Sequence, residues 1–385
     1  MVKGSAPSSM KVGLVVSPYK MSGLSRYALE LSQSLPKLGV DLEIVQARPA
    51  SAIQRGMDWI KRLGPDLGAF WGTYPPYVPM EGDGIYHLTH AALATSLYLS
   101  RPERVVVTVH DIIHYVLRHD PELSTYQHGL HRAADALGLR ALRRASAIIA
   151  ISEYTKGALV EHLGLDPGQI HVVHRSVNLE RFKPMEVGPD FWRQHGLDPD
   201  LRYVLHLSSD EPRKNVGMLV RAFSQVAGEH PDARLLKIGR SQYPEYRQRL
   251  VEIVEELNLS DRVIFIDYVS EEDLPRFYNV AQAFVLPSLY EGFGLPALEA
   301  MACGCPVICS DRPPLATEIV GDAGILVDCI DVASLSRAVA EALCAQRVNR
   351  IYRERGLEKA FSFSSEKEAS RTLAVYQGVW AHARR

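Results

Sequence analysis

The chain of 385 residues is 46% hydrophobic and 23% charged, and its 43 Lys and Arg nearly balance its 45 Asp and Glu. At about 150 residues per domain, this length predicts two domains, at most three, each with its own core. The balanced charge excludes a chain-wide basic surface, so we expect no nucleic-acid partner. No apolar run approaches the roughly 20 residues that span a bilayer, and the run at residues 12–16 is too short for a signal peptide.

Two features of the sequence, the first nine residues and the five cysteines, do not point to a functional site. Residues 1–9 are small and polar, as in a tag remnant or a disordered tail. The five cysteines lie beyond residue 300 without a C-x-x-C pair or zinc-like spacing to histidines. We therefore expect buried free thiols in a reducing, cytoplasmic compartment. These cysteines are Cys303, Cys305, Cys309, Cys329 and Cys344.

Short apolar runs alternate with helical patterns along residues 11–173. Because the runs are continuously apolar and rich in β-branched residues, they predict parallel strands buried on both faces. Spaced apolar residues predict a helix that begins at Leu24. The predicted strands are residues 11–17, 41–45, 85–89, 105–110, 147–151 and 170–173.

A proline-rich stretch, residues 182–200, predicts a link to a second set of alternations. Its predicted strands are residues 203–207, 234–238, 263–266, 283–286 and 307–309. Its predicted helices are residues 216–227, 243–257, 272–280, a short one from Pro296, and 332–345. The fold class is thus α/β, with two doubly wound domains at residues 10–184 and 185–362 and a last helix, within 363–385, that packs back on the first. The carboxyl ends of the strands would line a cleft.

Residues 287–306, PSLYEGFGLPALEAMACGCP, hold the most informative pattern. Pro296 is suited to a first helical turn and Gly304 to a helix end, which predicts a short helix after a strand. The backbone amides of Gly294 and Leu295 would form an anion site at its start. Glu291 and Glu299 flank that start, where carboxylates can hydrogen-bond the hydroxyls of a ribose and of a sugar ring.

Glu291, seven intervening residues and Glu299 lie within EGFGLPALEAMACGCPV, which resembles the signature of the family-4 retaining glycosyltransferases with a GT-B fold. The resemblance extends in order and spacing over residues 11–376. It implies two Rossmann-like domains, with Glu291 against the transferred sugar and Glu299 on the ribose. It also places Phe293, Gly294 and Leu295 in the donor-binding segment.

A second motif, SSDEPRKN at residues 208–215, follows a predicted strand and precedes a helix. The planar fork of Arg213 and the point charge of Lys214 suit phosphate oxygens, and the resemblance implies that they bind the donor diphosphate. Ser208, also in the donor-binding set, stands where some members carry Arg, so part of that cationic clamp is absent or supplied differently. Asn215 is expected to cap the helix.

The first predicted domain contributes two candidates. His110 follows a strand, at the end that faces ligands in open sheets, and the resemblance implies that it hydrogen-bonds the donor sugar. Gly23 belongs to a turn similar to the family's glycine-rich loop and allows close approach of a ligand, although Ser22 replaces the usual second glycine. Arg175 and Ser176 likewise replace a usual Asn-Gly turn.

The resulting hypothesis is a retaining hexosyltransferase of polysaccharide biosynthesis. The resemblance implies a nucleotide-diphosphate sugar donor, GDP-mannose or a UDP-sugar, and an acceptor hydroxyl on a glycan, a lipid-linked sugar or a small molecule. The only D-x-D match, Asp198 to Asp200, lies in the proline-rich link, so we expect neither a metal nor another cofactor. A nucleotide-sugar epimerase and a non-catalytic nucleotide-sugar-binding protein remain the alternatives, and product formation separates the three.

A basic helical pattern bears on the membrane. Arg132, Arg140, Arg143 and Arg144 accompany leucines, which is compatible with weak peripheral contact at the inner face of a membrane. An ordinary helix that covers the sheet is the favoured interpretation. The sequence does not predict the oligomeric state.

Overall fold

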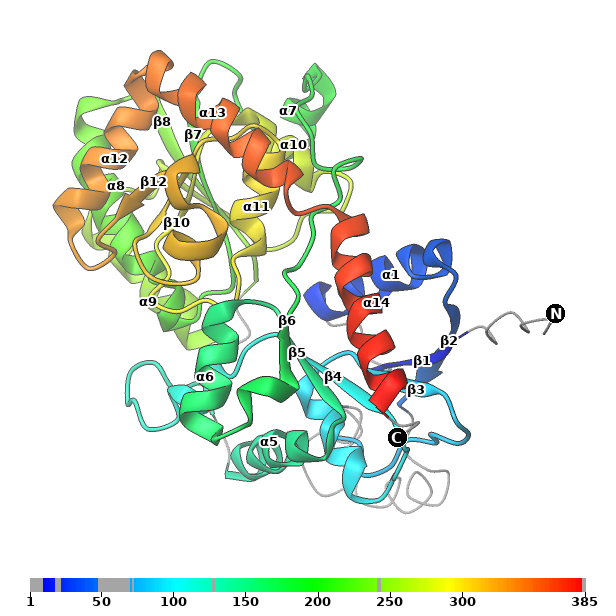
Figure 1. Ribbon diagram of the computed structural model, residues 1–385. Coiled ribbons are helices and arrows are strands. Elements are labelled where there is room, and N and C mark those ends of the chain that lie inside the picture. The colour runs from blue at the N-terminus through cyan, green and yellow to red at the C-terminus, as the bar shows by residue number, and fades with distance from the viewer. Residues whose placement is uncertain are drawn as a thin grey trace. The chain divides into compact units, whose positions relative to one another are not determined.

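The computed structural model describes residues 10–17, 22–47, 70, 73–126, 129–240 and 244–382, so the tail at 1–9 lies outside the described residues. The chain forms two compact units (Figure 1). The first unit comprises Met1–His119, Tyr126–His174 and Ser365–Arg385, and the second comprises Asp120–Thr125 and Arg175–Ser364. Apart from the short segment Asp120–Thr125, the chain leaves the first unit after His174 and returns to it at Ser365.

The sheet of the first unit has six strands in the order β2-β1-β3-β4-β5-β6, and every pair is parallel. Each residue of β4, VVVTV, is buried, as expected for a strand with helices on both faces. The predicted strands are therefore confirmed. Their bounds are β1 (Lys11–Val16), β2 (Asp41–Gln46), β3 (Ile85–Leu88), β4 (Val105–Val109), β5 (Ala147–Ala150) and β6 (Ile170–Val172).

Helices α1, α4, α5, α6 and α14 belong to the first unit. Ser152 caps α6, because its Oγ accepts a hydrogen bond of 3.0 Å from the Thr155 amide. Helix α14 contacts α1 and β5, and its Tyr376 shares a core with Leu14 and Tyr27. The bounds are α1 (Ser22–Ser34), α4 (Ile113–Val116), α5 (Gly129–Ala141), α6 (Glu153–Leu163) and α14 (Ser365–His382).

The basic helix α5 covers part of the first unit's core. It contacts the 3-10 segment Ala91–Tyr98 and buries Ala134 and Leu139, whereas Leu130 and Leu137 are exposed. This is the arrangement of an amphipathic covering helix.

The sheet of the second unit also has six parallel strands, in the order β12-β11-β10-β7-β8-β9. Five of them were expected from the sequence, and the three-residue β12 was not. The bounds are β7 (Arg202–Leu207), β8 (Ala233–Ile238), β9 (Val263–Ile266), β10 (Ala281–Leu286), β11 (Val307–Ser310) and β12 (Ile325–Val327). Two Rossmann-like parallel sheets confirm the predicted fold class.

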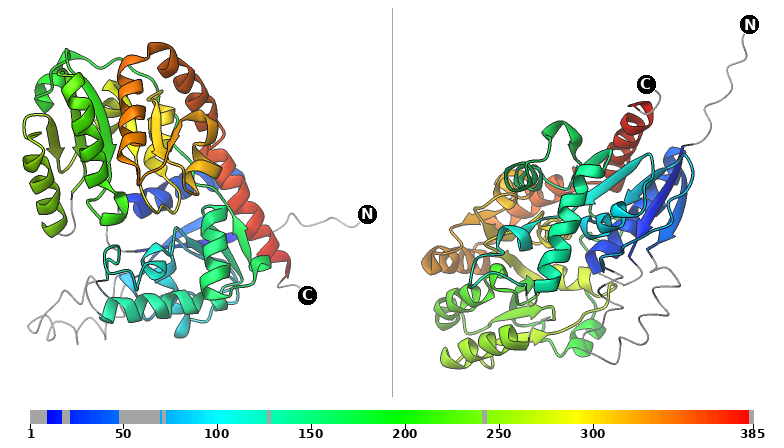
Figure 2. Two further views of the ribbon diagram at one scale, coloured as in Figure 1. Left: turned by 90° about the vertical axis from the view of Figure 1, so that its left-hand side faces the viewer. Right: turned by 90° about the horizontal axis from the view of Figure 1, so that it is seen from below.

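Helices cover the second sheet, and in the left view of Figure 2 the green α8 and the orange α12 lie side by side. The proline-rich link contains a helix that the sequence did not predict, α7, in which Phe191 packs at 4.9 Å on the ring of Phe277. Helix α13 was also not expected. The bounds are α7 (Pro189–His195), α8 (Val216–Glu229), α9 (Pro244–Glu256), α10 (Leu274–Val280), α11 (Leu295–Ala302), α12 (Val332–Cys344) and α13 (Gln346–Phe361).

The cysteines are free thiols, and four of the five are buried. The expectation of a buried thiol is wrong for Cys344, which is exposed at the end of α12. Its Sγ lies 3.7 Å from Nε2 of His230.

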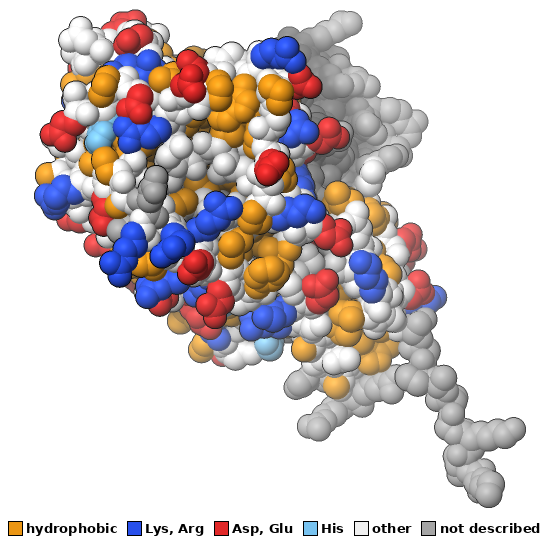
Figure 3. All heavy atoms as spheres, turned by 90° about the horizontal axis from the view of Figure 1, so that it is seen from above, with side chains coloured by type: hydrophobic (Ala, Val, Ile, Leu, Met, Phe, Trp, Pro, Cys, Tyr) orange, Lys and Arg blue, Asp and Glu red, His pale blue; other side chains and the backbone are white. Residues whose placement is uncertain are grey.

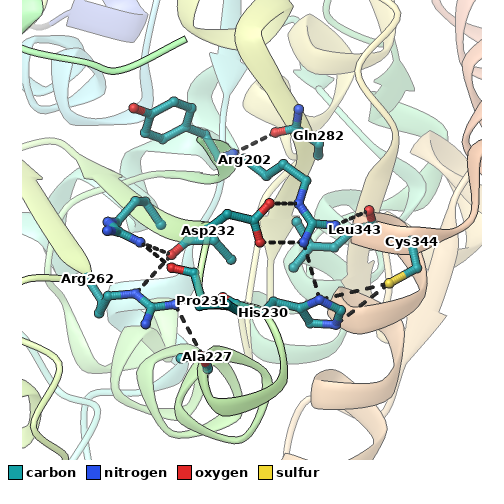
Figure 4. Close-up of polar contacts among 12 residues, drawn as sticks. Arg202, Ala227, His230, Pro231, Asp232, Arg262, Gln282, Leu343 and Cys344 are labelled. Atoms are coloured by element: carbon teal, nitrogen blue, oxygen red, sulfur yellow. Dashed lines mark hydrogen bonds and ion pairs between the residues drawn. The ribbon is translucent and has the colours of Figure 1, made fainter. Parts of the chain in front are cut away.

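An ion pair joins the starts of β7 and β8 (Figure 4). Arg202 donates from Nε and Nη2 to the two carboxylate oxygens of Asp232, at 2.5 Å each, and from Nη1 to the carbonyl of Leu343 at 2.7 Å. The fork of the guanidinium thus matches the carboxylate in a bidentate pair. It connects two strands and the end of α12 at the edge where these strands begin.

This pair predicts a small acid dependence of stability. The hydrogen bond from Arg202 lowers the pKa of Asp232 below its ordinary value. The stabilisation is therefore fully present above the unfolded-state pKa and is lost as pH falls through the lower folded-state pKa. The carboxylate is 41% exposed, so the effect should be modest. We expect Asp232→Asn to flatten the fall of Tm below pH 4.5; an unchanged acid slope would contradict this assignment.

Candidate nucleotide-sugar site

The predicted short helix of residues 287–306 is present as α11, directly after β10 and a loop. Gly294 precedes it with φ 104°, and a Cβ there would lie 2.3 Å from Cδ2 of Leu315. Glycine is thus required both for the left-handed backbone and for space. Pro296 lies in the first turn, and Gly304 follows the helix with φ 73°. The backbone amides at the start of α11 lie at the carboxyl edge of the sheet, as expected.

Glu291 lies at the centre of a polar cluster in the loop before α11. Its Oε1 accepts hydrogen bonds from Nζ of Lys214 at 2.7 Å and from Oγ of Ser288 at 2.8 Å. Arg213 Nη1 lies 3.9 Å from Oε2. Glu291 is 8% exposed. We call Glu211, Arg213, Lys214, Ser288 and Glu291 the anion cluster.

Strand order explains why these distant residues meet. β7 and β10 are neighbours in the sheet, so the loops that follow them lie side by side. The Leu289 amide donates to the Arg213 carbonyl at 2.8 Å, and Arg213 Nη1 donates to the Tyr290 carbonyl at 3.2 Å. The structure therefore brings Arg213, Lys214 and Glu291 together.

The charges in the anion cluster are paired. Burial raises the pKa of Glu291, but the charges of Lys214 and Arg213 outweigh it and leave the pKa below its ordinary value. Glu291 is thus a carboxylate at neutral pH. Sequence reasoning missed Glu211, whose Oε2 accepts from Nε of Arg213 at 2.7 Å. Two cations therefore face two carboxylates.

Glu299 lies on α11 and is 2% exposed. Its Oε2 accepts a hydrogen bond of 3.0 Å from the hydroxyl of Tyr278, a buried residue of α10. Because Tyr278 precedes Glu299 by 21 residues on another helix, no local spacing pointed to this pair. The contact fixes one oxygen of a carboxylate near the start of α11.

Asn215 occupies the N-cap position of α8, but its side chain makes no capping hydrogen bond, so the prediction of a side-chain cap is wrong. Its backbone has φ 58°, and its Nδ2 donates to the carbonyls of Pro287 at 3.2 Å and Cys329 at 2.7 Å. Asparagine tolerates this left-handed backbone better than most residues. The side chain instead joins the end of loop 208–215 to two neighbouring loops.

Two further predicted donor-binding side chains point into the second unit. Oγ of Ser208 lies 2.7 Å from Nε2 of the buried His206 and donates to the Ser209 carbonyl at 2.6 Å. The ring of Phe293, 3% exposed, packs edge to face on Phe363 with centroids 6.0 Å apart. Leu295, the first residue of α11, is partly exposed.

His110 lies in the first unit, one residue after β4. Its Nε2 donates to the Thr89 carbonyl at 3.0 Å, and its ring packs edge on to Tyr27 with centroids 5.0 Å apart. Oγ1 of Thr108 contacts both the Tyr27 hydroxyl at 2.8 Å and Nε2 of His87 at 2.7 Å. Buried polar contacts therefore fix the orientation of His110.

Gly23 lies in the first turn of α1, and residues 18–21 of the predicted glycine-rich turn lie outside the described residues. A cavity of about 520 Å³ lies at the other edge of the second sheet, by the starts of β10 and β11. It contains none of the predicted site residues. Tyr278, Gln282, Gly304, Arg350 and Arg353 are among its lining residues.

The described part of the chain contains neither a candidate metal centre nor a membrane-spanning helix. Within it, no three His, Cys, Asp or Glu side chains gather as ligands for a metal ion. No helix there is both long and apolar enough to cross a membrane.

Comparison with known proteins matches each half of the chain to a glycosyltransferase family. Residues 21–181 match the family described as "Glycosyltransferase Family 4", and residues 189–359 match "Glycosyl transferases group 1". The chain is 31% identical to the O-antigen chain mannosyltransferase B of Escherichia coli, over 96% of this chain and 100% of that protein. It is 28% identical to D-inositol 3-phosphate glycosyltransferase 2 of Catenulispora acidiphila, over 92% and 89% of the two chains.

Solved structures agree on the fold. Sucrose-phosphate synthase from Thermosynechococcus elongatus superposes with a TM-score of 0.74 at 22% identity, over 97% of this chain and 100% of that one. HepE from Anabaena, in complex with UDP and glucose, superposes with a TM-score of 0.70 at 17% identity, over 96% and 100%. The chain therefore belongs to the family-4 glycosyltransferases and has their GT-B fold.

Proposed function

We propose that this glycosyltransferase moves a hexose from a nucleotide-diphosphate sugar to an acceptor hydroxyl, with retention of anomeric configuration. The observation that carries the proposal is the anion cluster, in which Arg213 and Lys214 converge on Glu291 beside the start of α11. Cations, a helix start and a carboxylate suit a diphosphate next to a hydroxyl-rich ring.

Donor binding rearranges the anion cluster. Phosphate oxygens take over contacts of Lys214 and Arg213, which frees the carboxylate of Glu291 to accept from sugar hydroxyls. Glu299, already held by Tyr278, accepts from the ribose hydroxyls. The backbone amides of Gly294 and Leu295 add to the positive potential at the diphosphate.

Bond cleavage transfers electrons to the leaving diphosphate, and Lys214 and Arg213 stabilise the developing charge. The acceptor hydroxyl attacks the anomeric carbon on the face that the diphosphate leaves, and its proton passes to a phosphate oxygen. His110 contacts the donor sugar and orients the reacting centre. The configuration is retained in a front-face displacement, which needs no carboxylate nucleophile on the opposite face.

The donor is tested directly by thermal-shift measurements against a panel of nucleotide sugars. GDP-mannose is our first expectation, supported by the Escherichia coli mannosyltransferase relative, and UDP-sugars are the second. A donor at 100 times its Kd should stabilise the fold by about 2.7 kcal/mol. The bound donor is then incubated with glycan, lipid-linked and small-molecule acceptors, and a new glycoside is expected. A free epimer, or binding without product, would contradict the proposal.

We further propose that turnover requires no metal ion, since Arg213 and Lys214 neutralise the diphosphate. Addition of EDTA to enzyme freed of divalent ions should leave kcat within about twofold of its original value, because the cationic side chains remain in place. Glycoside formation with and without EDTA measures this. Loss of activity that Mg²⁺ or Mn²⁺ restores would contradict it.

A further inference from the structure

Beneath loop 208–215 lies a fully buried charged pair that the proposed reaction does not use. Nζ of Lys237 pairs with Oδ1 of Asp210, and both side chains are 0% exposed. The same Nζ donates to the carbonyl of Ser208 at 2.7 Å and to that of Gly239 at 2.9 Å. One ammonium thus holds the start of the loop after β7 to the end of β8.

A third side chain completes this contact set. Arg247 of α9 donates from Nε to Oδ2 of Asp210 at 2.7 Å and from Nη2 to the Gly239 carbonyl at 2.8 Å. Its Nη1 lies 2.9 Å from Oδ1 of Asp267, after β9. We call Asp210, Lys237 and Arg247 the buried ion network. It joins the loops after three neighbouring strands at the edge that carries the anion cluster.

The backbone at Gly239 has little conformational freedom, because it packs directly against Ser208. Gly239 has φ 120°, and a Cβ there would lie 2.2 Å from the Ser208 carbonyl oxygen. The two backbone segments therefore touch, with Lys237 bridging both. At its other end the loop is tied by Asn215 to Pro287 and Cys329.

Burial of two charges is costly, and apolar side chains of similar volume often give equal stability. Burial lowers the pKa of Lys237, and the hydrogen bond and negative charge of Asp210 only partly offset this shift. The hydrogen bonds from Lys237 to the carbonyls of Ser208 and Gly239 instead suit a role in fixing the backbone conformation of loop 208–215. Arg213 follows Asp210 by only three residues, so the position of Asp210 restricts that of the guanidinium.

We propose that Asp210, Lys237 and Arg247 are positioning residues that hold loop 208–215 in the shape in which Arg213 and Lys214 receive the donor diphosphate. The inference rests on the proposed function of these two cations.

The test compares nucleoside diphosphates with the matching monophosphates. Calorimetric Kd values for GDP, GMP, UDP and UMP are measured on the full chain as wild type, Lys237→Met, Arg247→Ala, Arg213→Ala and Arg202→Met. Arg202→Met is the matched control, because it breaks a pair between β7 and β8 at the opposite edge of the same sheet. Arg247 is 20% exposed, so its variant remains informative if Lys237→Met does not fold.

The ratio of diphosphate to monophosphate affinity is the readout, since a purely structural defect weakens both. We expect this ratio to fall about tenfold in Lys237→Met and Arg213→Ala, as for a charged hydrogen bond, to fall less in Arg247→Ala, and to stay unchanged in Arg202→Met. If Arg213→Ala lowers this ratio but both Lys237→Met and Arg247→Ala leave it unchanged, the inference is overturned. If Lys237→Met does not fold, an unchanged ratio in Arg247→Ala overturns the inference by itself. An unchanged ratio in Arg213→Ala, or no diphosphate binding by wild type, overturns the proposed function and the inference with it.

Discussion

Replacement of Lys214 by alanine is expected to lower kcat by about 100- to 1000-fold, the cost of removing one group that stabilises transition-state charge. The ammonium lies 2.7 Å from Glu291 and is the proposed partner of the leaving diphosphate. Because charge on the leaving group grows as the bond breaks, kcat should fall more than donor affinity does. Steady-state rates and calorimetric donor affinities separate the two effects.

The same substitution should move the acid limb of the pH profile. Lys214 is one of the two charges that lower the pKa of Glu291, so its loss raises that pKa. Residual activity should then disappear at a higher pH than in wild type. Arg249→Ala, at an exposed position of α9, is the control and should behave as wild type. A kcat equal to that of wild type in Lys214→Ala would remove Lys214 from the mechanism.

Glu299→Ala should weaken nucleotide binding by about 1.5–3 kcal/mol, or roughly 10- to 150-fold, because it removes a charged acceptor of hydrogen bonds. The carboxylate is almost fully buried and is held by Tyr278, so its position is fixed before the nucleotide arrives. Calorimetry with the nucleoside diphosphate of the selected donor measures the loss. In contrast to Lys214→Ala, kcat at saturating donor should change little.

A ligand analogue tests the ribose contact itself. The 2′,3′-dideoxy nucleotide should bind wild type more weakly than the natural nucleotide, whereas Glu299→Ala should no longer distinguish the two. Tyr278→Phe keeps the carboxylate and removes only the hydroxyl that holds it, so it should retain most of that discrimination. If Glu299→Ala still prefers the natural nucleotide to the same extent, Glu299 does not hold the ribose.

The fold was predictable wherever local patterns are strong. Continuous apolar runs such as β4 gave the parallel strands, and Pro296 and Gly304 marked the ends of α11. α13 was not predicted because QRVNRIYRERGLEKAF is rich in charged residues and lacks a clear apolar face. β12 was not predicted because three residues are too few to show a periodic pattern. In the proline-rich link, Pro189 starts a helix instead of excluding one.

The predicted site residues Arg213, Lys214, Glu291 and Glu299 came from motifs, but the motifs did not predict all of the side chains that hold the site in place. Glu211 lies only two residues before Arg213 in the same loop, whereas Tyr278 on Glu299 and Lys237 on Asp210 are contacts set by which strands and helices are neighbours. The spacing of residues along the sequence does not reveal which strands are neighbours in a sheet, so these pairs can be identified only once the fold is known. The same holds for Asn215. The local sequence pattern favours a side-chain cap on α8, but in the fold the side chain donates to the carbonyls of Pro287 and Cys329 instead.

A crystal structure with GDP or UDP, whichever binds more tightly, would show where the nucleoside diphosphate binds. We expect diphosphate oxygens within hydrogen-bonding distance of Lys214 Nζ and the Arg213 guanidinium, and ribose hydroxyls within hydrogen-bonding distance of the Glu299 carboxylate. The cavity lined by Arg350 and Arg353 offers an alternative cationic site at the other edge of the same sheet. A diphosphate bound there, with the Lys214–Glu291 pair intact, would contradict the account.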